Sequence, residues 1–265
     1  MNKIAIAYRI YPGISKSPYF HSDDKLKLSE LGIKSLKLGL GNIEAKIYFL
    51  LDNCPEEYKT MILKYFNQSE VEFLEYNGIG NLKTFEKQIE ILLNQNFSEI
   101  IYFAEDDYLY LPNCFEEGIY MLNNNKADFV SLYDHIDSYR LSFQKIKSKI
   151  FLGEKNHWRT NSSTCLTFMT TKQTLSKTKK VFLTYCKGNY DYNIWITLTK
   201  YNLLNFTSRE NFLLLLRGCF YGLIYIIFVK KYVLITPLPS LCTHLESTGI
   251  APIVDWQDYF KQINK

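Results

Sequence analysis

Short apolar runs alternate with amphipathic stretches through the first half of the chain. Such runs predict strands at 3–8 and 46–51 and a buried strand at 100–103, and the alternating run at 71–76 predicts a half-exposed strand. Between them, apolar residues recur with helical spacing and predict helices at 25–39, at 55–66 and at 82–95. Because strands and helices alternate at short intervals, the sequence predicts an α/β fold with a Rossmann-like, mostly parallel central sheet and helices on both faces.

The second half of the chain is less regular. It predicts helices at 112–124, 174–186 and 191–201, and strands at 127–133 and 164–170. The polar segment 134–158 predicts a loop or a hairpin. The segment 236–256 is rich in Pro, Ser and Thr but also apolar, and it predicts an ordered loop packed on the domain.

One stretch, 211–229, is almost wholly apolar but contains Arg217 and two glycines. A helix that spans a membrane needs about 20 consecutive apolar residues. Arg209, Lys230 and Lys231 flank the stretch, where they could meet anionic headgroups. Three structures fit: a helix lying in the membrane interface, a buried helix followed by a strand, or a spanning helix. We favour the first.

Composition narrows the class of protein. The 265 residues have a net charge of +4 and scattered lysines, which gives no support to nucleic-acid binding. The six cysteines form no C-x-x-C pair and fit no zinc module, so we expect reduced thiols. No signal-peptide pattern precedes the first predicted strand. We therefore expect a cytoplasmic protein, in peripheral contact with the cytoplasmic face of an inner membrane through 211–229.

Three consecutive acids, Glu105, Asp106 and Asp107, follow the apolar run at 100–103. Unpaired carboxylates are too costly to bury inside a sheet, so we expect them at the carboxyl end of the strand, where ligands bind in open α/β sheets. Mg²⁺ and Mn²⁺ prefer such oxygen ligands and complete their shells with phosphate oxygens. The triplet indicates either a metal–diphosphate site or a solvated acidic turn before the next helix.

Two further polar residues follow predicted strands of the same sheet. Arg9 comes after the strand at 3–8, and Asp52 comes after the strand at 46–51. Because parallel strands present their carboxyl ends at one edge, we expect both residues near the acid triplet. Their convergence favours the metal–phosphate interpretation.

These acids, Asp191 and His244 together resemble the GT-A-fold glycosyltransferases, and most nearly the bacterial family 2 enzymes. The resemblance covers about residues 3–256 and includes the strand–helix–strand start and a DXD-like motif in the triplet. In the family, a Glu-Asp-x-Asp-Leu/Ile-Trp segment opens a helix. Here residues 190–195 read Tyr-Asp-Tyr-Asn-Ile-Trp, so a tyrosine replaces the glutamate and an asparagine replaces the second aspartate.

The resemblance implies a metal-dependent reaction. Asp107, Glu105 and His244 would hold Mn²⁺ or Mg²⁺, which stabilises the charge on the leaving nucleoside diphosphate. Asp191 would take the proton of the acceptor hydroxyl as it attacks the anomeric carbon, so that this centre is inverted. The residues by themselves also allow plainer roles, with Asp191 as a first-turn helix acid and His244 as a hydrogen-bonded loop histidine.

The resemblance also implies a place for the donor. Arg9, Asp52 and Asp106 would bind the nucleotide sugar, Arg9 through phosphate or ribose and Asp52 by accepting from the base. For Arg9 and Asp52 the alternative is a surface charge at a strand end.

The implied domain organisation divides the chain at residue 205. Residues 1–205 would form the GT-A catalytic domain, with a nucleotide-binding half at 1–107 and an acceptor half at 108–205. Residues 206–265 would form a C-terminal extension with the apolar segment and the His-bearing loop. The expected activity is sugar transfer from a nucleotide-sugar donor to a surface glycan such as lipopolysaccharide or capsule, or to a lipid-linked acceptor. The alternatives are a Mg-dependent nucleotidyltransferase and a non-catalytic binding subunit of a glycan-assembly complex.

Overall fold

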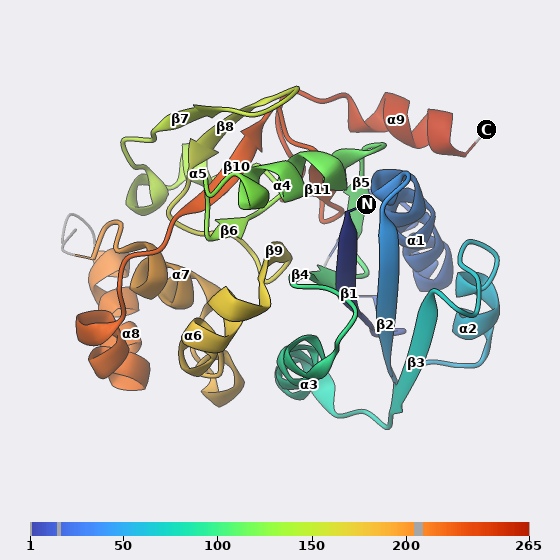
Figure 1. Cartoon of the computed structure of the whole chain (residues 1–265), viewed down its shortest axis with the longest axis horizontal. Helices are drawn as coiled ribbons and strands as arrows, with labels where there is room; N and C mark the ends of the chain where they lie inside the picture. The colour runs from blue at the N-terminus through green and yellow to red at the C-terminus, as the bar shows by residue number, and fades with distance from the viewer. Residues whose placement is uncertain (1, 15–16, 204–208, 265) are drawn as a thin grey trace.

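The computed structural model describes residues 2–14, 17–203 and 209–264 (Figure 1). Within these residues, nine strands form one sheet in the order β3-β2-β1-β4-β9-β6-β10-β8-β7. The strands are β1 (Lys3–Ile10), β2 (Glu44–Asp52), β3 (Val71–Tyr76), β4 (Ile100–Glu105), β6 (Phe129–Val130), β7 (Ile150–Leu152), β8 (His157–Thr160), β9 (Phe168–Thr171) and β10 (Leu234–Leu238). A separate pair consists of β5 (Tyr108–Tyr110) and β11 (Cys242–His244).

The first four strands, β1 to β4, are parallel to one another. Strand β9 runs antiparallel to β4 and to β6, β10 runs parallel to β6, and β8 runs antiparallel to both β10 and β7. Therefore only β8 and β9, among the described strands of this sheet, run against the common direction. The predicted mostly parallel sheet is confirmed.

Helices cover both faces of the sheet, as the sequence predicts. They are α1 (Lys25–Leu40), α2 (Glu57–Ile62), α3 (Gly80–Asn94), α4 (Cys114–Asn123), α5 (Asp137–Arg140), α6 (Lys172–Phe182), α7 (Asp191–Thr199), α8 (Arg209–Phe228) and α9 (Trp256–Ile263). Short 3-10 turns occupy Ser142–Gln144 and Tyr185–Lys187.

Alternate side chains of β1 divide the core into two layers, because successive residues of a strand point to opposite faces. Ile4 and Ile6 belong to one buried cluster, which includes residues of α1, α2, α4 and α9. Ala5 and Ala7 belong to the other, which includes residues of α3, α6 and α7. Figure 1 shows α1 and α3 on opposite sides of the parallel strands.

Several predicted elements differ in extent. The strand predicted at 127–133 pairs only at Phe129–Val130, and the strand predicted at 164–170 begins at Phe168. The segment 134–158 contains α5 and most of the β7–β8 hairpin. The tail at 236–256 is not the predicted loop, because its first residues lie in β10, between β6 and β8. Part of the segment assigned to a C-terminal extension thus belongs to the central sheet.

The apolar stretch 211–229 lies mostly in α8, a helix kinked at Gly222 and not followed by a strand at once. Many of its large apolar side chains are exposed. We find no helix within the described residues that is long and apolar enough to cross a membrane.

Candidate functional site

The carboxyl ends of β1, β2 and β4 border a polar cleft. Arg9 lies opposite Glu105 in the register of β1 with β4, so these two strand ends meet side by side. A cavity of about 540 Å³ opens here, and a second of about 270 Å³ adjoins it, since Asn81, Glu105 and Asp107 line both. Cavities of this size suit small-molecule ligands. Arg9, Asp52 and all three acids line the larger cavity, as the sequence predicts.

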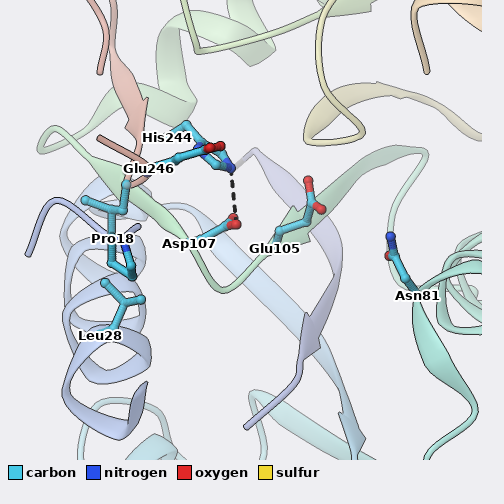
Figure 2. A pocket seen from close by; sticks show the side chains of 8 residues that line it. Pro18, Leu28, Asn81, Glu105, Asp107, His244 and Glu246 are labelled. Atoms are coloured by element: carbon cyan, nitrogen blue, oxygen red, sulfur yellow. Dashed lines mark hydrogen bonds and ion pairs between the residues drawn. The ribbon is translucent and has the colours of Figure 1, made fainter. Parts of the chain in front are cut away.

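The smaller cavity contains a carboxylate–imidazole pair (Figure 2). His244 Nε2 lies 3.1 Å from Asp107 Oδ2. The backbone fixes this approach, because β11 pairs with β5 and Leu245 N donates to Asp107 O at 2.7 Å. The other oxygen, Asp107 Oδ1, is buried and has no hydrogen-bond partner among the described residues. A buried carboxylate oxygen without a partner is costly, and it is suited to a cation.

The pair shifts both pKa values. Burial raises the pKa of the Asp107 carboxyl, but His244, Lys25 and Arg9 outweigh this effect and lower the pKa to about 2. Burial lowers the pKa of the His244 imidazole, but the Asp107 carboxylate outweighs burial and raises that pKa. Glu246 N donates to the second ring nitrogen, His244 Nδ1, at 3.2 Å and so orients the ring.

A divalent cation fits this pair once His244 Nε2 gives up its proton, because only an unprotonated ring nitrogen has a lone pair for a metal. Neighbouring ligands of an octahedral ion lie about 3 Å apart, which matches the 3.1 Å between Asp107 Oδ2 and His244 Nε2. No group of three or more His, Cys, Asp or Glu side chains in the described part of the chain could hold a metal ion. A cation at the pair would therefore take the rest of its shell from a ligand and from water, as Mg²⁺ commonly does with phosphates.

Glu105 is engaged elsewhere. Arg9 Nη2 donates to its Oε1, and Thr167 Oγ1 donates to its Oε2 at 2.8 Å. Arg9 Nη1 also donates to the side chain and the backbone carbonyl of Asn81. Figure 2 shows Glu105 between Asp107 and Asn81. Glu105 thus holds Arg9 at the cleft wall, and the structure does not bring its carboxylate into contact with His244.

The middle acid, Asp106, faces α1. Lys25 Nζ lies 2.8 Å from Asp106 Oδ2, and both side chains are largely buried. Ser29 Oγ and Tyr11 N donate to the same oxygen at 3.3 and 3.4 Å. Burial raises the pKa of Asp106, although the Lys25 charge opposes this shift. These contacts tie the acid triplet to α1 and to the end of β1.

Asp52 fixes the start of α3. Its two carboxylate oxygens accept hydrogen bonds from Ile79 N and Gly80 N, each at 2.8 Å. The turn needs positive φ at Gly78 and Gly80, a conformation open to glycine without strain. Asp52 lines the larger cavity, but its carboxylate supports the adjoining turn.

Asp191 opens α7, as predicted, and lies apart from the lining of both cavities. Its Oδ1 accepts from Tyr192 N at 2.6 Å. Burial raises the pKa of the Cys165 thiol, and the charges of Asp191, Glu105 and Asp107 raise it further. Cys165 is therefore close enough to feel the charges of Asp191 and of two acids of the triplet.

Sequence reasoning missed two residues of the site. Lys25 pairs with Asp106, and Asn81 contacts Arg9 while lining both cavities. The only local signal for Asn81 was its position directly after Gly78 and Gly80, which mark a turn beside the sheet edge. Lys25 had no distinctive signal, since a lysine in a first helical turn is ordinarily exposed.

The fold and this cleft define an α/β protein with a carboxylate–imidazole site at the carboxyl edge of parallel strands. No protein-family model matches the sequence, and no curated protein is similar to it at a significant level.

Solved structures similar in fold are sugar-nucleotide transferases. The galactosyltransferase LgtC, in complex with donor and acceptor sugar analogues, is 8% identical, with 73% of this chain and 69% of that chain covered and a TM-score of 0.43. The glycosyltransferase GlyE of Streptococcus pneumoniae TIGR4 is 12% identical. The match covers 99% of this chain and 64% of that chain, with a TM-score of 0.46. A proposed nucleotide-diphospho-sugar transferase of Desulfovibrio desulfuricans G20 is 10% identical, with 74% of each chain covered and a TM-score of 0.45. Because these TM-scores are below 0.5, the function proposed for this chain rests on its own residues.

Proposed function

We propose that this protein transfers a sugar from a nucleoside-diphosphate donor to a glycan acceptor, and that a divalent cation assists. The main support for this proposal is the Asp107–His244 pair, whose side chains lie 3.1 Å apart in a cleft at the carboxyl edge of parallel strands. The other Asp107 oxygen, Oδ1, is buried and has no hydrogen-bond partner among the described residues. The carboxyl edge is where open α/β sheets bind nucleotides. The polar cavity of about 540 Å³ beside the pair has room for such a ligand.

Asp107 and His244 would hold Mn²⁺ or Mg²⁺, which when bound offsets the negative charge on the leaving diphosphate. Arg9 would face the donor from the wall of the larger cavity, where Glu105 and Asn81 hold its guanidinium in place. Asp106 and Asp52 would support the walls of the site, because Lys25 and the amides of the α3 turn already occupy their carboxylates.

Asp191 would act as the general base. The acceptor hydroxyl attacks the anomeric carbon, its proton passes to the Asp191 carboxylate, and the bond from the anomeric carbon to the diphosphate oxygen breaks with the electron pair going to the diphosphate. Direct attack of this kind inverts the anomeric centre. For the acceptor we propose a lipid-linked or surface glycan, because α8 exposes an apolar face of the kind that contacts membranes.

Thermal melting of the purified protein tests the donor site. We would screen nucleoside diphosphates and nucleotide sugars, each with and without Mn²⁺. A ligand that binds only the folded state at 100 times its Kd adds about 2.7 kcal/mol of stability, which corresponds to a rise in Tm of about 5 °C or more for a chain of this size. We expect such a rise for one nucleotide, dependent on Mn²⁺ and absent in Asp107→Asn.

Glu72→Gln is the matched control, since Glu72 is an exposed carboxylate on β3, away from the lining of the cleft. A Mn²⁺-independent shift that persists in Asp107→Asn would contradict the metal role. No shift for any nucleotide would contradict the donor site. The remaining candidate would then be a non-catalytic binding subunit. In its favour, Tyr190 and Asn193 stand where the glycosyltransferase segment described above has acids. Asn193 is fully buried and donates to Asn189 Oδ1 at 3.1 Å, a structural position.

A further inference from the structure

Among the described residues, α8 carries more exposed large apolar side chains than any other helix or strand. Of the 19 large apolar side chains exposed among the described residues, eight lie on this one helix. They are Phe212, Leu213, Leu216, Phe220, Leu223, Ile224, Ile227 and Phe228. Their spacing follows the helical repeat, so they form one continuous stripe. Exposed apolar patches of this kind mark sites of interaction.

The helix α8 differs from an ordinary surface helix because its outward face is apolar. An ordinary surface helix buries its apolar stripe and exposes charged residues. Here the charged residue in the middle of the helix, Arg217, turns towards the protein and contacts Gly188 O and the ring of Tyr190. Phe220 and Phe228, which are 83% and 78% exposed, point outwards instead. The outer face therefore suits an apolar medium.

The charges around α8 favour an anionic partner. Arg209 at its start and Lys230 and Lys231 just after its end are exposed. From 209 to 245 the sequence has one acid, Glu210, against four Arg or Lys residues, so the charge around the helix is positive. We propose that α8 docks in the interface of an anionic lipid bilayer and that Arg217 couples this contact to the loop that carries Asp191. The apolar stripe would enter the boundary between headgroups and acyl chains, and the flanking cations would meet anionic headgroups.

A second copy of the chain is a poorer occupant for this face. A symmetric pair of α8 helices would bring the cations at 209, 230 and 231 of one copy towards those of the other. Glu210 is the one acid between 209 and 245, too few to compensate these cations. Like charges brought together across an interface cost free energy, whereas an anionic bilayer supplies the opposite charge.

Side chains of α8 contact the residues that immediately precede Asp191. The Arg217 guanidinium lies 3.9 Å from the ring centroid of Tyr190, and its Nη2 donates to Gly188 O. Tyr190 immediately precedes Asp191, the first residue of α7. Two residues further along α7, Asn193 packs against Gly218, where an added Cβ would lie 3.6 Å from the Asn193 side chain.

The loop at 188–190 thus lies against α8, where both Arg217 and Tyr221 contact it, and Arg217 is the charged residue of the two. A change in the order or angle of α8 on a bilayer would pass through Arg217 to the segment that positions Asp191. Arg217 is a positioning residue in this account. The coupling rests on the proposed role of Asp191, whereas the lipid contact does not.

Vesicle co-sedimentation tests the lipid contact without any need for activity. The full-length protein is incubated with vesicles of phosphatidylcholine and phosphatidylglycerol at a 7:3 ratio, or of phosphatidylcholine alone. We expect binding to the mixed vesicles that falls by about tenfold or more in Phe220→Ser/Ile224→Ser, because two large apolar side chains lose their burial. Lys230→Gln/Lys231→Gln should weaken binding by a similar factor.

The matched control is Ile150→Ser/Leu152→Ser, which removes two apolar side chains that are 58% and 72% exposed on β7. It should bind vesicles as the wild type does. Equal binding by the wild type and Phe220→Ser/Ile224→Ser, or no preference for anionic vesicles, would overturn the proposal. A wild-type dimer that becomes monomeric in Phe220→Ser/Ile224→Ser would overturn it in favour of a second copy.

Hydrogen exchange of the amides at 188–193 tests the coupling. On mixed vesicles we expect exchange there to slow severalfold in the wild type, and to stay unchanged in Arg217→Gln although that variant still binds. Arg217→Lys keeps a cation over Tyr190 and should recover part of the slowing. Unaltered exchange in the wild type, or equal slowing in Arg217→Gln, would refute the coupling. Neither readout involves the donor, so a failure of the proposed transferase activity would be seen separately.

Discussion

Lys25 Nζ lies 2.8 Å from Asp106 Oδ2, and their side chains are only 7% and 12% exposed. The pair joins the first turn of α1 to the acid triplet at the end of β4. Breaking a buried ion pair leaves an uncompensated charge, which is more damaging than removing both partners. Variants of Lys25 and Asp106 therefore test whether this ion pair stabilises the folded protein.

We predict that Lys25→Met lowers the free energy of unfolding by about 3 kcal/mol. The double variant Lys25→Met/Asp106→Asn should lose less free energy of unfolding than the single variant, since no buried charge remains unpaired. Urea denaturation measures both. Lys27→Met is the control, because Lys27 is 65% exposed in its pair with Asp24, and an exposed ion pair contributes little to stability. Equal losses in the single and double variants would argue against a supporting role for the pair.

The Asp107–His244 pair predicts a pH window of stability in metal-free buffer. The raised pKa of His244 means that its contribution is complete below the unfolded value of about 6.5 and is lost as the pH rises through the folded value. The pKa of Asp107, lowered to about 2, means that its contribution is complete above the unfolded value and is lost as the pH falls towards 2.

The stability difference between the wild type and Asp107→Asn should therefore be largest between about pH 4 and pH 6.5, at about 2 kcal/mol. It should shrink on either side of that window. Guanidinium denaturation over a pH series measures the difference. A difference that does not vary with pH would show that the pair is not ionised in the folded protein.

Asp52→Ala should destabilise the turn that opens α3. It removes the acceptor of two backbone N–H groups, those of Ile79 and Gly80, at a site where the aspartate is 3% exposed. We expect a loss of about 2–3 kcal/mol and faster hydrogen exchange at both amides. Asp24→Ala is the control, because it removes the exposed cap of α1 at Lys27 N, and it should cost less stability than Asp52→Ala. If Asp52→Ala costs no more than that control, Asp52 is free to serve a ligand instead.

Asp191→Asn should lower turnover by about 10²- to 10⁴-fold if the carboxylate is the general base. The asparagine keeps an oxygen that can accept from Tyr192 N, as Asp191 Oδ1 does, so the start of α7 should remain folded. Nucleotide binding, followed by thermal shift, should persist. Turnover that is unaffected would assign Asp191 to helix capping alone.

The polar ends of the strands are the part of the site that the sequence could predict. Arg9, Asp52 and the acids at 105–107 each follow a run of buried strand residues, and a parallel register brings such ends to one edge. Their partners were not predictable in this way. Asn81 and Lys25 reach the site from the starts of two helices, and helical patterning says which face is buried, not which distant carboxylate lies beneath it.

By itself, the sequence determined the class of fold, the order of its first strands and helices, and the chemistry gathered where those strands end, because these follow from local periodicity and from the cost of burying charge. Only the tertiary structure decided that β10 enters the middle of the sheet, that β11 brings His244 to Asp107, and that α8 turns its apolar side outwards. Contacts between residues far apart in the chain depend on the path of the backbone between them, and no local pattern records that path.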